Sequence, residues 1–239
     1  GRIIMSKIAI IIPSRLDAVR LPNKPLELIN NKEMILHVYE AAKKTDSEVY
    51  VATPDQKIID VVNQNKGKAV LTSTDHQTGT DRIYEVFKDH LNSEPNLIIN
   101  LQGDMPNIEP QAISNLINYM KEGNCDIGTL ASSFSSDDEL ADENNVKVAA
   151  KEKLTNGKFS EALDFFRKDS NEYENYYHHV GIYAFTNKAL VRYVSLKRSK
   201  LELERKLEQL RALENSMSIH VGYINSSPLS VDTKNDLME

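Results

Sequence analysis

The stretch IAIIIPSRLDAVRLPNKPL, residues 8–26, joins an apolar run to a loop rich in proline and positive charge. The run is composed mostly of isoleucine and ends at Pro13, a pattern typical of a strand that is buried on both faces. We expect that strand over 7–12. Strands of this kind occur almost only in parallel sheets whose faces are covered by helices, so the stretch favours an α/β fold.

Strands and helices are expected to alternate along the rest of the chain. Further strands are predicted at 48–52, 68–71, 96–101, 126–133, 146–150, 180–185 and 219–224, and helices at 33–43, 56–65, 81–90, 109–122 and 188–194. Leucines at helical spacing predict one more core-facing helical stripe over 201–214. The alternation predicts parallel crossover units and hence a three-layer, mostly parallel sheet. The pattern loosens over 137–175, which we expect to be an excursion from a single domain covering 1–239, and a candidate dimer arm.

The composition of the chain argues against several classes of protein. The chain of 239 residues has a formal net charge of −6, so it has no overall positive field that would gather nucleic acid. The longest apolar run, 8–12, is too short to cross a bilayer, and no apolar targeting segment is seen at the start. Cys125 is the single cysteine, which excludes an internal disulfide and fits a reducing compartment. We therefore expect a cytoplasmic protein without membrane insertion or a nucleic-acid partner.

The loop after the first predicted strand is the leading candidate for an anion site. Ligands of open parallel sheets gather at the carboxyl ends of the strands, and this loop carries Arg15, Arg20 and Lys24. Two guanidinium groups and an ammonium group can offset the charge of a triphosphate. The loop has no glycine and no GK[ST] ending, so it is not a Walker loop. A solvated basic turn is the alternative explanation.

Two aspartates also follow predicted strands. Asp104 lies in LQGDMP, residues 101–106, and Asp232 lies in LSVDT, residues 229–233. Mg²⁺ prefers one or two carboxylates together with phosphate oxygens and water, so the pair would suit a magnesium site. An aspartate that caps a turn explains either position equally well. A zinc site is not expected, because there is one cysteine and no HExxH spacing.

The segment DHQTGTDR, residues 75–82, precedes a predicted helix. Its Thr78, Gly79, Thr80 and Arg82 could face a ligand, although helix capping accounts for the same residues. Further on, His178 and His179 are adjacent in a predicted strand, so their side chains should point to opposite faces.

Taken in order, these motifs resemble the 3-deoxy-manno-octulosonate (Kdo) cytidylyltransferases, the CMP-Kdo synthetases of lipopolysaccharide synthesis. The resemblance covers nearly the whole chain, and its pieces are residues 11–26 (IIPSRLDAVRLPNKPL), 75–82, 100–106 (NLQGDMP), 144–148 (NNVKV), 178–185 (HHVGIYAF), 207–221 (LEQLRALENSMSIHV) and 230–233 (SVDT). It implies a glycosyltransferase-A-like fold, usually in a homodimer. It also implies a reaction in which the anomeric hydroxyl of the sugar acid attacks the α-phosphate of CTP and expels pyrophosphate.

The resemblance also assigns roles to residues. Lys24, Arg15 and Arg20 would be catalytic, with Lys24 nearest the α-phosphate, and Asp104 and Asp232 would hold Mg²⁺. The residues implied to bind the nucleotide are Pro13, Ser14, Arg15, Arg20, Lys24, Thr78, Gly79 and Thr80. Those implied to bind the sugar acid are Arg82, Gln102, His179, Glu208 and Gln209.

The chain departs from the family pattern in three places. Asn23 and Met105 replace a glycine and a glutamate of the family, and both changes keep the phosphate and metal candidates. In the segment FSEALDFFRKD, residues 159–169, Glu161 stands where the family has an arginine expected near the carboxylate of the sugar acid. A like charge there would weaken binding, and Arg167 is the candidate to replace the lost positive charge.

Three alternatives therefore remain open from the sequence. CMP could pass to another acidic sugar, such as 8-amino-Kdo or a sialic-type acid. The chain could be a nucleotide-binding relative without catalysis. A molybdopterin-type or hexose-1-phosphate nucleotidyltransferase is the third alternative, but these usually carry a glycine-rich first loop, which is absent here.

Overall fold

The computed structural model describes residues 7–17 and 23–225. The chain divides into two compact units, and within the described residues the first unit holds 7–114 and the second holds 115–225. The expectation of a single domain with an excursion over 137–175 stays a prediction. No helix within the described ranges is long and apolar enough to cross a membrane.

The first unit is built on a parallel sheet with the strand order β5-β4-β1-β6. Its strands are β1 (Ile8–Pro13), β4 (Glu48–Thr53), β5 (Ala69–Leu71) and β6 (Leu97–Leu101). Ile10 pairs with Val49 on one side and with Ile99 on the other. Ile10, Ile11 and Ile12 are completely buried, as expected for a central strand covered on both faces. The α/β class that the isoleucine run predicts is confirmed.

Helices connect the strands of this unit. They are α1 (Met34–Lys43), α2 (Gln56–Gln64) and α3 (Gly79–Glu85), the last continuing into a π-helical turn, η2 (Val86–His90). Between β1 and α1 lie a short 3-10 helix, η1 (Lys24–Leu26), and a two-stranded hairpin, β2 (Leu28–Ile29) and β3 (Lys32–Glu33). The hairpin was not expected from the sequence, and each of its strands is too short to show a period.

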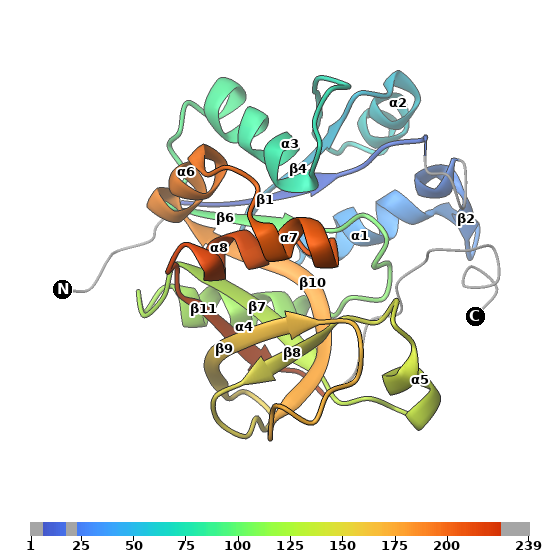
Figure 1. Ribbon diagram of the computed structural model, residues 1–239. Coiled ribbons are helices and arrows are strands. Elements are labelled where there is room, and N and C mark those ends of the chain that lie inside the picture. Colours follow the sequence, from blue (N-terminus) through green and yellow to red (C-terminus); the bar gives the residue numbers. More distant parts are fainter. Residues whose placement is uncertain (1–6, 18–22, 226–239) are drawn as a thin grey trace. The chain divides into compact units, whose positions relative to one another are not determined.

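The second unit contains a mixed sheet with the order β10-β7-β11-β9-β8. Its strands are β7 (Ile127–Ser132), β8 (Lys147–Ala150), β9 (Phe159–Phe166), β10 (Tyr176–Thr186) and β11 (Ile219–Tyr223). Only β11 and β7 run parallel, and the other pairs are antiparallel. The long β10 pairs with β8 at its start and with β7 further along, and Figure 1 shows β8 and β9 beside it.

The helices of the second unit follow the predicted alternation in part. They are α5 (Asp137–Ala141), α6 (Asn187–Ser195), α7 (Lys200–Arg205) and α8 (Leu210–Glu214), and α4 (Pro110–Met120) carries the chain into this unit. β9 was not expected, because residues 159–166 show no clean alternation of apolar and polar side chains. A register shift between β8 and β9 explains this pattern, since it changes which side chains face the core.

The single helical stripe expected over 201–214 is wrong. α7 ends at Arg205, and α8 begins only at Leu210. Lys206, which follows α7, adopts a left-handed conformation with φ 57°. Leu203, counted in the apolar stripe, is 54% exposed.

A buried ion pair joins these two helices. Glu202 in α7 is fully buried, and its two carboxylate oxygens accept hydrogen bonds from Nε and Nη2 of Arg211 at 2.9 and 2.7 Å. Burial raises the pKa of Glu202, but the hydrogen bonds from Arg211, Ser199 and Arg198 outweigh it and the pKa is lowered. The guanidinium of Arg211 also lies over the ring of Tyr193, 4.5 Å from its centroid. This network holds α7 and α8 together.

Glu202→Gln is expected to lower the free energy of unfolding by about 3 kcal/mol, because Arg211 is then left buried without its counter-charge. Since folding lowers the pKa of Glu202, the effect is present at neutral pH and should shrink as the pH falls below about 4.3, the ordinary pKa of glutamate. Denaturant unfolding measured over this pH range tests both points.

The matched control is Glu152→Gln in the same unit. Glu152 pairs with Lys158 at 3.8 Å, and both side chains are about half exposed or more. This change should alter the free energy of unfolding by no more than about 1 kcal/mol. Equal effects of the two substitutions would show that the buried pair has no special role.

Candidate active site

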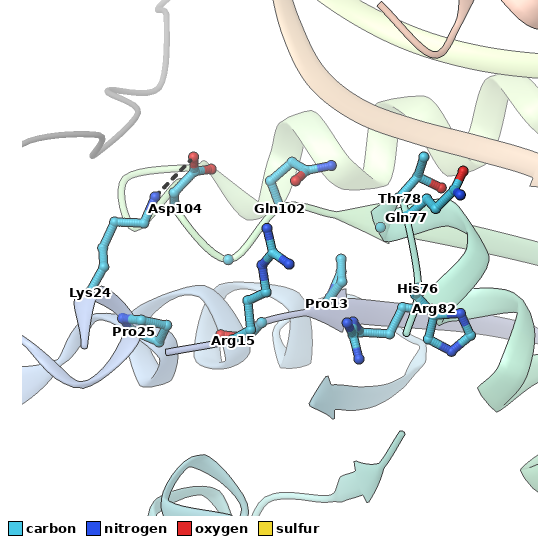
Figure 2. A pocket seen from close by; sticks show the side chains of 13 residues that line it. Pro13, Arg15, Lys24, Pro25, His76, Gln77, Thr78, Arg82, Gln102 and Asp104 are labelled. Carbon is cyan, nitrogen blue, oxygen red and sulfur yellow. Dashed lines mark ion pairs between the residues drawn. The ribbon is translucent and has the colours of Figure 1, made fainter. Parts of the chain in front are cut away.

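The first unit contains a cavity of about 290 Å³ at the carboxyl ends of β1 and β6. Figure 2 shows side chains from three loops pointing toward it. The residues that line it are Pro13, Ser14, Arg15, Lys24, Pro25, His76, Gln77, Thr78, Gly79, Arg82, Gln102, Gly103 and Asp104. The loops after β1, β5 and β6, which the sequence singles out separately, therefore meet at one place.

Close packing around Pro13 brings these loops together. A Cβ atom added at Gly103 would lie 3.3 Å from the carbonyl oxygen of Pro13, and one added at Gly79 would lie 3.3 Å from its ring. Larger side chains at either position would push the loops apart. Ser14 N donates to the carbonyl of Ala52 at 2.9 Å, which fixes the start of the basic loop against β4. The two glycines therefore allow an approach that other residues would obstruct.

Lys24 and Asp104 form an ion pair in the lining of the cavity. The distance between Lys24 Nζ and Asp104 Oδ2 is 3.7 Å, and both side chains are largely buried. Lys24 begins the 3-10 helix η1, directly after Asn23, whose φ of 60° is left-handed. Asparagine tolerates that conformation better than most residues. A cation and a carboxylate thus share one wall of the cavity, the first suited to phosphate oxygens and the second to a metal ion.

Arg15 and Arg82 add two more positive charges. The Arg15 side chain is more than half exposed and forms an ion pair with Asp17 at 3.2 Å. Arg82 is buried and donates to Thr72 Oγ1 and to the carbonyl of Ser73, each at 2.7 Å. Burial, and then the charge of Arg15, lower the pKa of Arg82. Because both acceptors are neutral, these hydrogen bonds do not cancel the charge of Arg82, and an anionic ligand would.

The segment that begins α3 has two roles. The hydroxyl of Thr78 accepts a hydrogen bond from the backbone of Asp81 at 3.1 Å, so its side chain caps α3 as the capping explanation proposed. Thr78 and Gly79 still line the cavity. Thr80 does not: it is 1% exposed, and its hydroxyl accepts from the Asn100 amide at 3.4 Å. Thr80 therefore holds the segment through buried contacts and does not face the cavity.

Sequence reasoning missed His76 and Gln77, although the segment containing them was singled out. His76 Nε2 lies 2.7 Å from a carboxylate oxygen of Glu85, which also accepts from the backbone of Ser73 at 3.0 Å. These bonds tie the cavity wall to α3. The signal that could have found His76 is its place in a loop that follows a strand end.

The cavity offers a limited set of metal ligands. Within residues 7–17 and 23–225, no group of three or more His, Cys, Asp or Glu side chains could hold a metal ion. Asp104 supplies one hard oxygen donor, which fits Mg²⁺ when phosphate oxygens and water complete the coordination. Ser14 Oγ is buried and has no hydrogen-bond partner in the described part of the chain, so an anionic ligand could satisfy it. Arg20 and Asp232 lie outside the described residues.

The other residues expected to meet the sugar acid lie in the second unit. The ring of His179 lies 5.4 Å from that of Tyr183, and burial together with the charge of Glu208 raises the pKa of Tyr183. His179 and Glu208 are thus both neighbours of Tyr183, a residue that the sequence analysis missed. Burial, and then the charge of His178, lower the pKa of His179 to about 3, so its ring is neutral near pH 7.

Glu208 and Gln209 are held by the buried network described above. They lie in the turn between α7 and α8, and the Tyr193 hydroxyl donates to the carbonyl of Glu208 at 2.9 Å. Gln209 is buried. The ion pair of Glu202 with Arg211 therefore fixes the backbone of this turn.

His178 and His179 face opposite sides of β10, as expected. His178 Nδ1 lies 3.1 Å from Glu139, and its ring stacks on Phe134, whereas His179 contacts Thr129. Burial lowers the pKa of His178 more than the nearby Glu139 raises it.

Glu161 does not share a face with His179. In the sheet register Glu161 is opposite His220, and His220 is opposite Gly128. Side chains at paired positions share a face, and this face packs on α4: the Tyr119 hydroxyl lies 2.6 Å from His220. Thr129, the next residue of β7, points to the other face and contacts His179. The expected repulsion between Glu161 and a carboxylate bound beside His179 therefore has no support in this geometry.

Arg167 is already engaged with the backbone. Its Nε donates to the carbonyl of Arg205 at 3.0 Å, and its Nη2 donates to that of Lys206 at 3.2 Å, at the carboxyl end of α7. It lines a second cavity of about 580 Å³ in the second unit, together with charged residues of both signs. Because its lining carries both positive and negative side chains, this second cavity does not favour an anionic over a cationic ligand.

Comparisons with known proteins identify the family of the chain. A family model described as cytidylyltransferase matches residues 9–219. The curated 3-deoxy-manno-octulosonate cytidylyltransferase of Rickettsia bellii is 42% identical, covering 96% of this chain and 93% of that protein. The protein of the same name from Bartonella henselae is 41% identical, covering 95% and 94%.

Among solved structures, CMP:2-keto-3-deoxy-manno-octonic acid synthetase complexed with CTP matches with a TM-score of 0.87 and 36% identity, covering 98% of this chain and 96% of that one. A UTP-bound UGPase from Acinetobacter baumannii matches with a TM-score of 0.70 at 11% identity, covering 97% and 91%, and shares the fold alone. The glycosyltransferase-A-like fold expected from the sequence is confirmed. From the family model and these relatives together, the chain belongs to the 3-deoxy-manno-octulosonate cytidylyltransferase family.

Proposed function

We propose that this protein transfers CMP from CTP to the anomeric hydroxyl of Kdo and releases pyrophosphate. The observation that carries the proposal is the first-unit cavity, in which Arg15, Lys24 and Arg82 surround a space that also contains Asp104. Two of these cations, Arg15 and Lys24, suit the phosphates of a nucleoside triphosphate, and the relatives that match nearly the full chain are named for the Kdo reaction.

The proposed mechanism consists of positioning and charge neutralisation. Phosphoryl and nucleotidyl transfers need in-line geometry and stabilisation of the charge on the phosphate oxygens, with little covalent work by the protein. Lys24 would stabilise the α-phosphate, and Arg15, with Arg20, would hold the outer phosphates. Ser14, Thr78 and Gly79 would border the nucleotide. Gln102, Arg82, His179, Glu208 and Gln209 would orient the sugar acid.

The proposal includes Mg²⁺ held by Asp104 and Asp232. When bound, the ion would neutralise phosphate charge and so lower the barrier to displacement. Its support is the carboxylate of Asp104 at the cavity wall, close to a cation that would bind the same phosphates. A homodimer in the cytoplasm, as the resemblance and the lone cysteine suggest, is part of the same proposal.

The direct test is pyrophosphate release from CTP with a panel of sugar acids, run with Mg²⁺ and with a chelator. We expect turnover with Kdo, less with 8-amino-Kdo and sialic-type acids, and none with the chelator. Preference for another sugar would replace Kdo as the substrate. CTP binding without release of pyrophosphate across the panel would show a nucleotide-binding relative without catalysis.

Lys24→Gln is expected to lower kcat by roughly 10²–10³-fold, because it removes a preorganised charge from the reacting phosphate. Lys57→Gln, an exposed lysine of α2, is the matched control for loss of one positive charge and should keep the wild-type kcat. Equal activity of the two variants in steady-state assays would remove Lys24 from the mechanism.

Glu161→Arg is expected to leave the KM for Kdo unchanged, because its side chain lies on the face of the sheet opposite His179. His179→Gln, which alters a residue proposed to meet the sugar, should raise that KM. A large change of the KM for Kdo in Glu161→Arg would mean that residue 161 influences the sugar pocket.

A further inference from the structure

The hydroxyl of Thr129 lies beside an irregular part of β10. The register between β7 and β10 shifts between Val180 and Tyr183, and the backbone there turns two carbonyls toward Thr129. Oγ1 of Thr129 lies 2.6 Å from the carbonyl oxygen of Ile182, 3.3 Å from that of Val180 and 2.8 Å from Nε2 of His179. Thr129 itself is completely buried, so water does not compete for these contacts.

The single hydrogen of this hydroxyl fixes the direction of the bonds. A hydroxyl donates once and accepts through two lone pairs, whereas a carbonyl oxygen only accepts. The shortest contact, 2.6 Å, goes to the carbonyl of Ile182, which therefore receives the hydrogen. Toward His179 the hydroxyl can then only accept. The hydrogen of that bond must come from the ring, so Nε2 carries a proton.

The ring of His179 is neutral and carries only this one proton. The edge of Phe165 packs against it with the centroids 5.1 Å apart, and Tyr183 lies 5.4 Å away. These neighbours are uncharged, and burial followed by the charge of His178 lowers the pKa of His179. A neutral ring with a proton on Nε2 has a lone pair on Nδ1. In the part of the chain that the structure describes, Nδ1 accepts no hydrogen bond.

We propose that Thr129 is a positioning residue, which holds His179 in its Nε2–H tautomer so that Nδ1 accepts a hydrogen from a hydroxyl group of the sugar acid. This inference rests on the proposed function for the identity of the ligand. A carboxylate has no hydrogen to give, so His179 selects for a hydroxyl, and the carboxylate of the sugar acid is bound by other groups. Thr129 touches neither substrate.

The first measurement is made on the wild-type protein. Long-range ¹H–¹⁵N NMR spectra of histidine-labelled protein distinguish a ring nitrogen that carries a proton from one that does not, and His179→Gln assigns the signal. We expect a protonated Nε2 and an unprotonated Nδ1 near pH 7. A ring protonated at Nδ1, or at both nitrogens, would overturn the inference whatever the enzyme activity.

The second measurement compares Thr129→Val with Thr129→Ser. Valine keeps the shape but removes the hydroxyl, so His179 should populate both tautomers and the KM for Kdo should rise roughly tenfold. The KM for CTP should not change. Serine keeps the hydroxyl and should restore both the wild-type tautomer and the wild-type KM. A wild-type KM for Kdo in Thr129→Val would overturn the positioning role.

The two proposals fail in different ways. If the wild-type protein forms no CMP-Kdo, the proposed function fails, while the NMR spectra still decide the tautomer of His179. If Thr129→Val does not fold, the wild-type spectrum and Thr129→Ser remain as the tests. A uniform loss of activity with equal changes in both KM values would indicate general damage to the second unit and would contradict a specific role in sugar binding.

Discussion

The parallel pairing of β1 with β4 and β6 is the constraint on which the candidate site depends. Because parallel strands end at the same edge of a sheet, the loops that follow β1 and β6 must begin side by side. The buried isoleucines of β1 make any shift of register costly, since the strand is covered on both faces. Lys24 and Asp104 can face each other only because this register is fixed.

In the second unit, buried polar interactions rather than strand register fix the positions of the candidate residues. The ion pair of Glu202 with Arg211 fixes the turn that carries Glu208 and Gln209, and the hydroxyl of Thr129 fixes the ring of His179. Glu202 and Thr129 are completely buried, and their directed hydrogen bonds give both sets of contacts a definite geometry. Apolar packing would tolerate small rotations of these side chains, whereas directed hydrogen bonds do not. Recognition of a sugar with many hydroxyl groups requires side chains that are held in fixed orientations.

Much of the first unit could be predicted from the sequence, because β1 and β6 are largely apolar, buried runs and the helices have a clear period. The second unit was harder for two physical reasons. β9 contains a register shift, so its side chains do not alternate. The helical stripe over 201–214 is broken at Lys206, whose left-handed backbone cannot be recognised from the spacing of the leucines.

Some residues of the candidate site could likewise be recognised from the sequence, and others could not. Arg15, Lys24, Thr78 and Asp104 were recognisable because each follows a strand end, and the structure brings them to one cavity. Tyr183 and Thr129 were not recognisable, because their importance comes from pairing across strands that are far apart in sequence. The face that Glu161 occupies was not recognisable for the same reason, since only the register of β9 with β11 shows it.

A crystal structure with CTP and Mg²⁺ is the decisive measurement for this candidate site. We expect triphosphate density in the cavity between Arg15 and Lys24, with phosphate oxygens within hydrogen-bond distance of Lys24 Nζ and a metal ion at the carboxylate of Asp104. Triphosphate bound elsewhere, with this cavity filled only by water, would contradict this expectation.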